Sequence, residues 1–340
     1  MFRHTSLRFW TLGLIAALAI WRALTAEYFG VETVTEIAIL AILVIALDMV
    51  AGFGGMVSLC HGALMGAGAY AYAMLTVKAG LAPPMAFAGA VAVTGAASWL
   101  IGAVCGRSHG IYFIMATLAF GQMAYSLVFE QPIFGGDDGI SGVPRIDLTI
   151  IGLDLNDGRT FAFVSLAVLG AVYWFATHVL QAGLGRSLTG IMHNEQRMRA
   201  LGVNVWRIKA DMFGLSGMIA AAAGALAAQH VMFVSPGLLN WTVSGEALVV
   251  VILGGLGTII GPVIGAIVFV LLKHEVSAHT DYWHLVVGLI LIAVVMSRAN
   301  GIFGWLEQRL SRLARPVPAR DVIANQVRKD LAAKGSLEDA

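Results

Sequence analysis

Long apolar runs recur along the whole chain, and they restrict its fold more than any other feature. Many run for about seventeen residues or more, which is enough for a helix to cross a hydrocarbon core of about 30 Å. Because 59% of the 340 residues are hydrophobic and only 12% are charged, a water-soluble globule could not bury this apolar surface. The sequence therefore predicts an all-α fold, a polytopic transmembrane helical bundle.

We expect about 8 to 10 membrane segments, some of them broken or re-entrant. The apolar runs cover residues 9–24, 34–50, 58–77, 84–105, 111–129, 161–180, 209–230, 246–272 and 284–297. For the first run a cleaved signal peptide is an alternative, because Leu24-Thr25-Ala26 resembles a small-residue cleavage site. We favour an uncleaved span, since Trp10 and Trp21 stand near its ends as interfacial anchors would.

Two longer polar loops predict the orientation of the chain. Loop 181–208 holds four arginines against the single acid Glu195, so the positive-inside rule places it in the cytoplasm. Loop 131–160 is rich in Asp and Gly and is expected in the periplasm, one span away. The basic residues at both ends place both termini in the cytoplasm. We divide the chain into a membrane domain, 1–310, and a cytoplasmic tail, 311–340.

The run 246–272 is interrupted by glycines, which a continuous helix would not favour. Gly254, Gly255 and Gly257 are followed by Gly261-Pro262. We expect a half-helix from Ser244 to Leu253, and a returning helix from Gly261 to Val276. Broken backbone at membrane depth needs protein or a water-filled cavity around it, so this break is a candidate translocation element.

A second glycine-rich stretch, Gly52 to Gly62, has a similar texture and includes Ser58 and His61. Two such segments in the two halves of a transporter indicate internal duplication and a central site. Ser58 and His61 therefore join the three glycines as candidate path residues. For His61 a neutral role, bonded to a freed backbone carbonyl, is an equal alternative. Asp48, like Glu246, is expected at a hydrated end of a span.

The basic loop also carries a helical pattern of apolar residues. Five of them recur at helical spacing: Leu188, Ile191, Met192, Met198 and Leu201. This pattern predicts an amphipathic cytoplasmic helix that ends at Gly202, with a surface-lying connector as the simpler alternative.

The sequence lacks motifs for ATP hydrolysis or for enzyme catalysis. It lacks the G-x-x-x-x-G-K-[ST] pattern that binds ATP phosphates, and it shows no paired carboxylates, metal cluster or activated nucleophile. We therefore expect no enzyme activity, no cofactor, no metal and no nucleic-acid partner. Any ATP-driven work would have to come from another subunit.

Several of these stretches together resemble a known family, in the same order and over about residues 34–298. They are Gly54 to Gly62, Tyr112 to Gly121, Gly135 to Gly142, Gly183 to Asn204, Val234 to Pro236 and Leu253 to Pro262. The chain is similar to the M-type (LivM-like) permease subunits of branched-chain amino acid ABC transporters.

This resemblance implies a bacterial inner-membrane importer for branched-chain or other apolar amino acids. The expected partners are an H-type permease, two cytoplasmic ATPase subunits, a periplasmic binding protein and membrane lipid. The coupling residues would be Gly185, Arg186, Glu195, Ala200, Leu201 and Gly202. Two alternatives remain, a permease for urea or short amides, and a proton-coupled secondary transporter that uses His61 and Asp48.

Overall fold

The computed structural model describes residues 28–146 and 155–279, with isolated positions at 282, 285, 286, 288, 289, 292, 301 and 304. The chain separates into two compact units, Met1–Phe303 and Gly304–Ala340, and the helices and strands with described bounds all belong to the first unit. The expected first span 9–24, most of the last span 284–297 and the tail 311–340 lie outside the described residues. The division at residue 310 therefore stays a prediction.

The described part of the chain is a helical bundle, which confirms the all-α fold class. Within it, six helices are long and apolar enough to cross a membrane. They are α2 (Tyr28–Ala51), α4 (Pro83–Cys105), α5 (Ile111–Glu130), α6 (Gly158–Gln181), α9 (Val205–Val231) and α11 (Ile260–Ser277).

Shorter elements connect these helices. The helices are α3 (His61–Ala73), continued by the π-helical turn η1 (Met74–Lys78), α7 (Gly183–His193), α8 (Glu195–Ala200) and α10 (Trp241–Gly254). Three 3-10 turns are η2 (Pro132–Phe134), η3 (Gly136–Asp138) and η5 (Pro236–Leu239). The strands β1 (Ile140–Ser141) and β2 (Phe233–Val234) pair antiparallel, with Ile140 opposite Val234.

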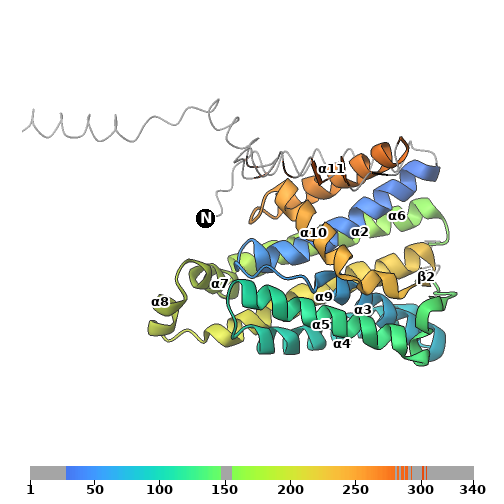
Figure 1. The fold of residues 1–340 in the computed structure, drawn as a ribbon. Coiled ribbons are helices and arrows are strands. Elements are labelled where there is room, and N and C mark those ends of the chain that lie inside the picture. The colour runs from blue at the N-terminus through green and yellow to red at the C-terminus, as the bar shows by residue number, and fades with distance from the viewer. Residues whose placement is uncertain are drawn as a thin grey trace, which may run out of the picture. The chain divides into compact units, whose positions relative to one another are not determined.

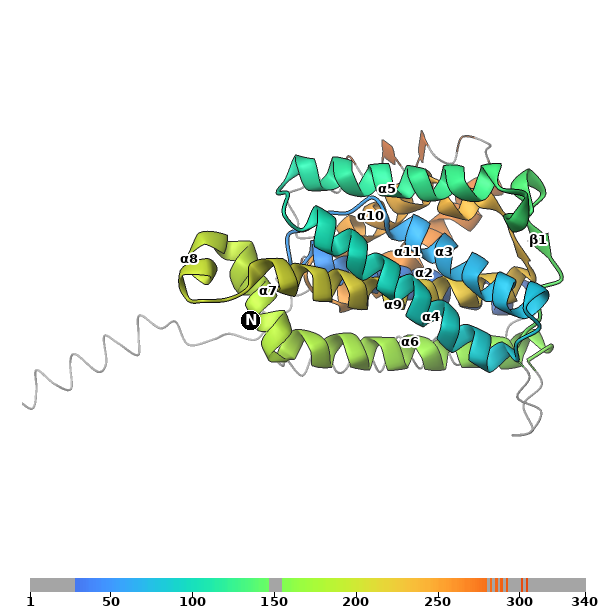
Figure 2. The ribbon, with the colours of Figure 1, turned by 90° about the horizontal axis from the view of Figure 1, so that it is seen from below.

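Helices α2 and α9 form the centre of the bundle, and α4, α5 and α6 lie around them (Figures 1 and 2). The two central helices are buried over most of their length, whereas the outer three leave most of their residues on the surface. Small residues let the central backbones touch. A Cβ at Gly224 of α9 would overlap the carbonyl oxygen of Met65 in α3, so this position requires glycine.

The two ends of the bundle differ. Helices α7 and α8 project past the long helices at one end, and the β1–β2 pair lies at the other (Figures 1 and 2). We call these the α7–α8 end and the β1–β2 end.

Candidate functional site

Two half-helices begin next to each other inside the bundle. The link 52–60 leads from the long helix α2 into α3, and a link of the same length, 232–240, leads from α9 into α10. The first turns of the half-helices are joined, because the backbone N–H of Gly62 donates to Ser244 Oγ at 2.9 Å. Both residues are buried. The internal duplication, which the sequence placed at 52–62 and at the glycine break 254–262, stays a prediction.

The expected break after α10 is confirmed. Helix α10 ends at Gly254 and α11 begins at Ile260. Gly255, Gly257 and the β-branched Ile259 have positive φ angles, a conformation that strains Ile259 in particular.

Asp48 of α2 holds this break in place. Its carboxylate accepts the backbone N–H of Gly257 at 2.7 Å and that of Ile259 at 3.2 Å. The side chain is 1% exposed, so the expected hydrated position was wrong. The reason is that the break folds back onto α2 and supplies donors to a carboxylate that water would otherwise solvate.

Ser58 and His61 are fully buried. His61 Nε2 lies 2.7 Å from Ser216 Oγ, and the Ser216 hydroxyl donates to the carbonyl of Ala46. Because that hydroxyl has one proton, His61 Nε2 is the donor to Ser216, which fixes the tautomer of a neutral imidazole. His61 therefore bonds to the side chain of Ser216, and not directly to a backbone carbonyl freed by the glycine turn. A path role for Ser58, His61 and the glycines Gly254, Gly255 and Gly257 stays a prediction.

The basic loop forms two helices where one was expected. Asn194 adopts an extended conformation between α7 and α8, and its side chain accepts the backbone N–H of Arg197 at 2.9 Å. This cap starts a new helix and therefore ends the previous one. The expected end at Gly202 is confirmed, because α8 stops at Ala200 and Gly202 has a φ angle of 80°.

The apolar stripe of this loop is divided between two surfaces. Leu188 and Ile191 are buried, and Leu188 packs near Gly54 of the bundle. Leu201 is 71% exposed, and Met192 is 49% exposed. Among the predicted coupling residues, Gly185 is buried, Glu195 is half-buried, and Arg186, Ala200, Leu201 and Gly202 are exposed. The loop is thus anchored through Leu188 and Ile191 of α7, and its most exposed apolar side chain is Leu201, directly after α8.

Glu195 ties α8 to the bundle. Its carboxylate accepts from Arg199 at 2.5 Å, from His109 Nε2 at 2.7 Å and from Lys209 Nζ at 2.9 Å. Lys209 is a buried residue of α9, and His109 lies in the link between α4 and α5. Burial raises the pKa of Glu195, but the bonds from Lys209, Arg199 and His109 outweigh it and lower the pKa to about 2.

The Glu195 anchor is expected to withstand acid until well below pH 5. Since the pKa falls from 4.5 in the unfolded chain to about 2, its stabilising effect is complete above pH 4.5 and is lost as the pH falls toward 2. Hydrogen exchange of residues 195–202, corrected for intrinsic rates, should show equal protection at pH 7 and pH 5 and lower protection at pH 3. A Glu195→Gln variant should show weaker protection at pH 7 and no such dependence.

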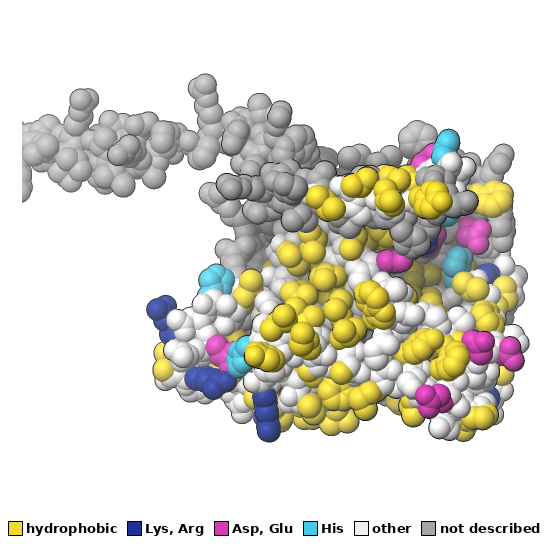
Figure 3. Space-filling model, in the orientation of Figure 1, with side chains coloured by type: hydrophobic (Ala, Val, Ile, Leu, Met, Phe, Trp, Pro, Cys, Tyr) yellow, Lys and Arg dark blue, Asp and Glu magenta, His cyan; other side chains and the backbone are white. Residues whose placement is uncertain are grey.

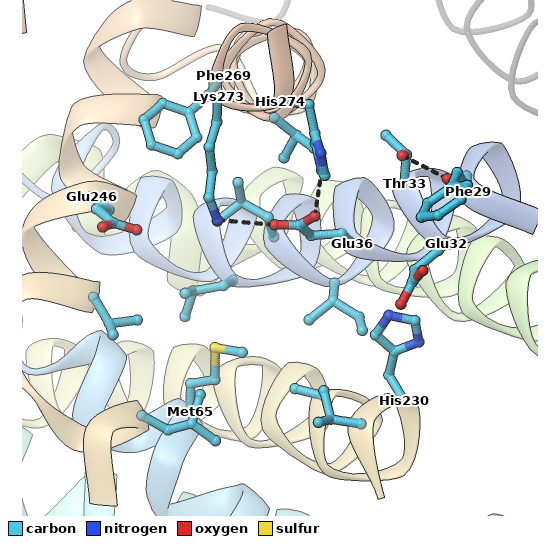
Figure 4. Close-up of a pocket in the computed structure, with 18 residues that line it drawn as sticks. Phe29, Glu32, Thr33, Glu36, Met65, His230, Glu246, Phe269, Lys273 and His274 are labelled. Atoms are coloured by element: carbon cyan, nitrogen blue, oxygen red, sulfur yellow. Dashed lines mark hydrogen bonds and ion pairs between the residues drawn. The ribbon is translucent and has the colours of Figure 1, made fainter. Parts of the chain in front are cut away.

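A cavity of about 690 Å³ opens between α2, α9, α10 and α11, with Met65 of α3 at its wall (Figure 4). It lies toward the β1–β2 end, because Phe29 and Val231 line it. Acidic and histidine side chains gather around a hollow at that end of the visible face (Figure 3). Sequence reasoning did not find this site. The sequence did contain a signal for it, because the charged residues Glu36 and Lys273 lie in apolar helices, where charge usually marks a functional site.

Taken together, the six long apolar helices, the two half-helices and the protruding basic loop define a multi-pass membrane protein of the transport class. The family model "branched-chain amino acid transport system / permease component" matches residues 29–295. The chain belongs to this family, and it is a LivM-like permease.

The relatives agree with this assignment. The chain is 28% identical to the high-affinity branched-chain amino acid transport system permease protein LivM of Salmonella typhimurium, over 83% of this chain and 71% of the relative. LivM of Escherichia coli K12 is also 28% identical, over 82% and 71%. LivH of the same strain is 26% identical, over 78% and 91%. No solved structure matches the chain.

Proposed function

We propose that this chain is the M-type permease subunit of an ATP-binding cassette importer for branched-chain or other apolar amino acids. It forms the translocation path together with an H-type permease. Two cytoplasmic ATPase subunits supply the work, and a periplasmic binding protein delivers the substrate. The observation that carries this proposal is α8, which protrudes from the bundle and exposes Leu201 among arginines.

Charge at the two ends supports the proposed orientation. Lys and Arg side chains gather at the α7–α8 end in Figure 3, and acidic ones gather toward the other end. By the positive-inside rule, the α7–α8 end faces the cytoplasm of a bacterial inner membrane, where ATPase subunits would be. Both termini would then also face the cytoplasm.

The contacts of α8 indicate how a movement caused by ATP hydrolysis could be passed to the translocation path. Docking of an ATPase subunit on Leu201 would pull on α8, and Glu195 would pass the displacement to Lys209 of α9. Helix α9 packs against α3, whose first turn adjoins that of α10. A rigid shift of α9 would therefore change the packing of both half-helices, which carry or adjoin the predicted path residues. This is alternating access by repacking, with no covalent chemistry.

Reconstitution of the assembled transporter tests the proposal. An affinity tag on this chain should bring down a second permease and ATPase subunits, and the complex in liposomes should import leucine only with ATP and the binding protein. Uptake driven by a proton gradient without ATPase subunits would replace it with the secondary transporter. Import of urea or acetamide in place of leucine would move the protein to the amide-transporting alternative.

A further inference from the structure

The cavity between α2, α9, α10 and α11 combines an ion-pair cluster with an apolar wall. Glu36 of α2 accepts from Lys273 Nζ at 3.1 Å and from His274 Nε2 at 2.9 Å, both on α11 (Figure 4). Glu32, Glu246 and His230 also line the cavity. Among the described residues that line the cavity, three carboxylates thus lie with one lysine and two histidines.

Much of the remaining wall is apolar and lies deeper in the bundle. It includes Ile39, Leu40, Leu43, Val243, Phe269 and Val270. Leu43 and Val270 are almost fully buried. The cavity therefore has a charged mouth, where Glu36 and Lys273 keep about a third of their side chains exposed, and an apolar interior. A volume of about 690 Å³ falls in the usual range for small-molecule sites.

We infer that this cavity binds a free α-amino acid with an apolar side chain, as its zwitterion. The α-ammonium would pair with the carboxylates of Glu36 and Glu246, and the α-carboxylate would pair with Lys273 and His274. The side chain would then lie against Leu40, Leu43 and Val243. This inference rests on the proposed function and adds to it a substrate-binding site within the permease itself.

The geometry of the ion pair favours a zwitterion over singly charged solutes. A zwitterion carries its two charges about as far apart as the Glu36 and Lys273 atoms, so it pairs with both when it lies antiparallel to them. A solute with a single charge would pair with only one of the two residues, Glu36 or Lys273. The other residue would keep its pull on that same partner in a partly desolvated site, so binding would be weaker.

Photolabelling of the assembled complex in nanodiscs, without the binding protein, tests this site. The probe is photo-leucine, a diazirine analogue that keeps both α-charges. We expect labelled peptides from residues 39–43 and 243–246, displaced by leucine but not by 3-methylbutylamine or 4-methylpentanoate, which each lack one charge. Glu36→Gln and Lys273→Met should each reduce labelling about tenfold, and Lys273→Arg should retain most of it.

Glu130→Gln is the matched control, because Glu130 is an exposed carboxylate at the end of α5 that does not line the cavity. Thermal unfolding of each variant separates lost binding from lost folding, and Lys273→Arg shows that the position accepts substitution. Unchanged labelling in folded Glu36→Gln and Lys273→Met would overturn the inference. So would equal displacement by the singly charged analogues, or a diazirine phospholipid that labels the cavity and is not displaced by leucine.

The two proposals fail differently. If the complex imports leucine with ATP but the cavity labels independently of charge, the proposed function stands and the site is wrong. If labelling depends on both charges but uptake does not require ATP, the site stands and the ATP-driven mechanism is wrong.

Discussion

Asp48→Ala is expected to lower the free energy of unfolding by about 2–5 kcal/mol, because it leaves one buried and one half-buried backbone N–H group without an acceptor. Those groups belong to Gly257 and Ile259, in the break between α10 and α11. Ile259 has a φ angle of 58°, and such strain persists only while its surroundings hold it. We therefore expect the unfolding midpoint of the purified chain to fall by roughly 5–15 °C.

Asp48→Asn should have an intermediate effect, since one carboxylate oxygen is kept as an acceptor while the other is replaced by a donor. Met49→Leu is the control, because Met49 is the equally buried neighbour of Asp48 and the exchange nearly conserves volume. A midpoint for Asp48→Ala within about 1–2 °C of that for Met49→Leu would show that the carboxylate does not support the break.

Local signals in the sequence were sufficient for much of the fold. Apolar runs located the long helices, because each must satisfy its backbone within a membrane whatever surrounds it. Glycines at 254, 255 and 257 located the break, since the conformation they allow is a property of each residue alone. The end of α8 at Gly202 followed for the same reason.

Contacts between distant segments could not be predicted in this way. Asp48 stands near the end of an apolar run, where water is the usual solvent for a carboxylate, and its acceptor role depends on backbone about two hundred residues later. The partners of Glu195, His109 and Lys209, come from separate segments for the same reason.

The cavity is the clearest example of this limit. Glu36 and Lys273 lie in different apolar helices, and only the packing of α2 against α11 brings their charged groups within 3.1 Å of each other. The division of the basic loop into two helices could have been predicted from the sequence. Asn194 directly before Glu195 is a helix-start signal in the sequence, and it was outweighed by the continuous apolar spacing.

Leu201→Ser is expected to reduce ATP-driven uptake by the assembled transporter about tenfold or more. Leu201 is 71% exposed, so its replacement should cost the fold less than about 0.5 kcal/mol. At a docking surface, loss of a central apolar anchor costs about 2 kcal/mol or more, which corresponds to roughly thirty-fold weaker docking. We expect fewer ATPase subunits to remain bound after purification in detergent.

Glu195→Gln separates docking from transmission. Leu201 is unchanged in this variant, so ATPase subunits should stay bound and hydrolyse ATP, while uptake falls because α8 no longer holds Lys209 and His109. Ile111→Ser is the control, because Ile111 is 60% exposed at the same end of the bundle but lies on α5. Wild-type docking and uptake in Leu201→Ser would remove α8 from the interface. Normal uptake in Glu195→Gln would show that force reaches α9 by another route, and the buried Leu188 of α7 would then be the next residue to replace.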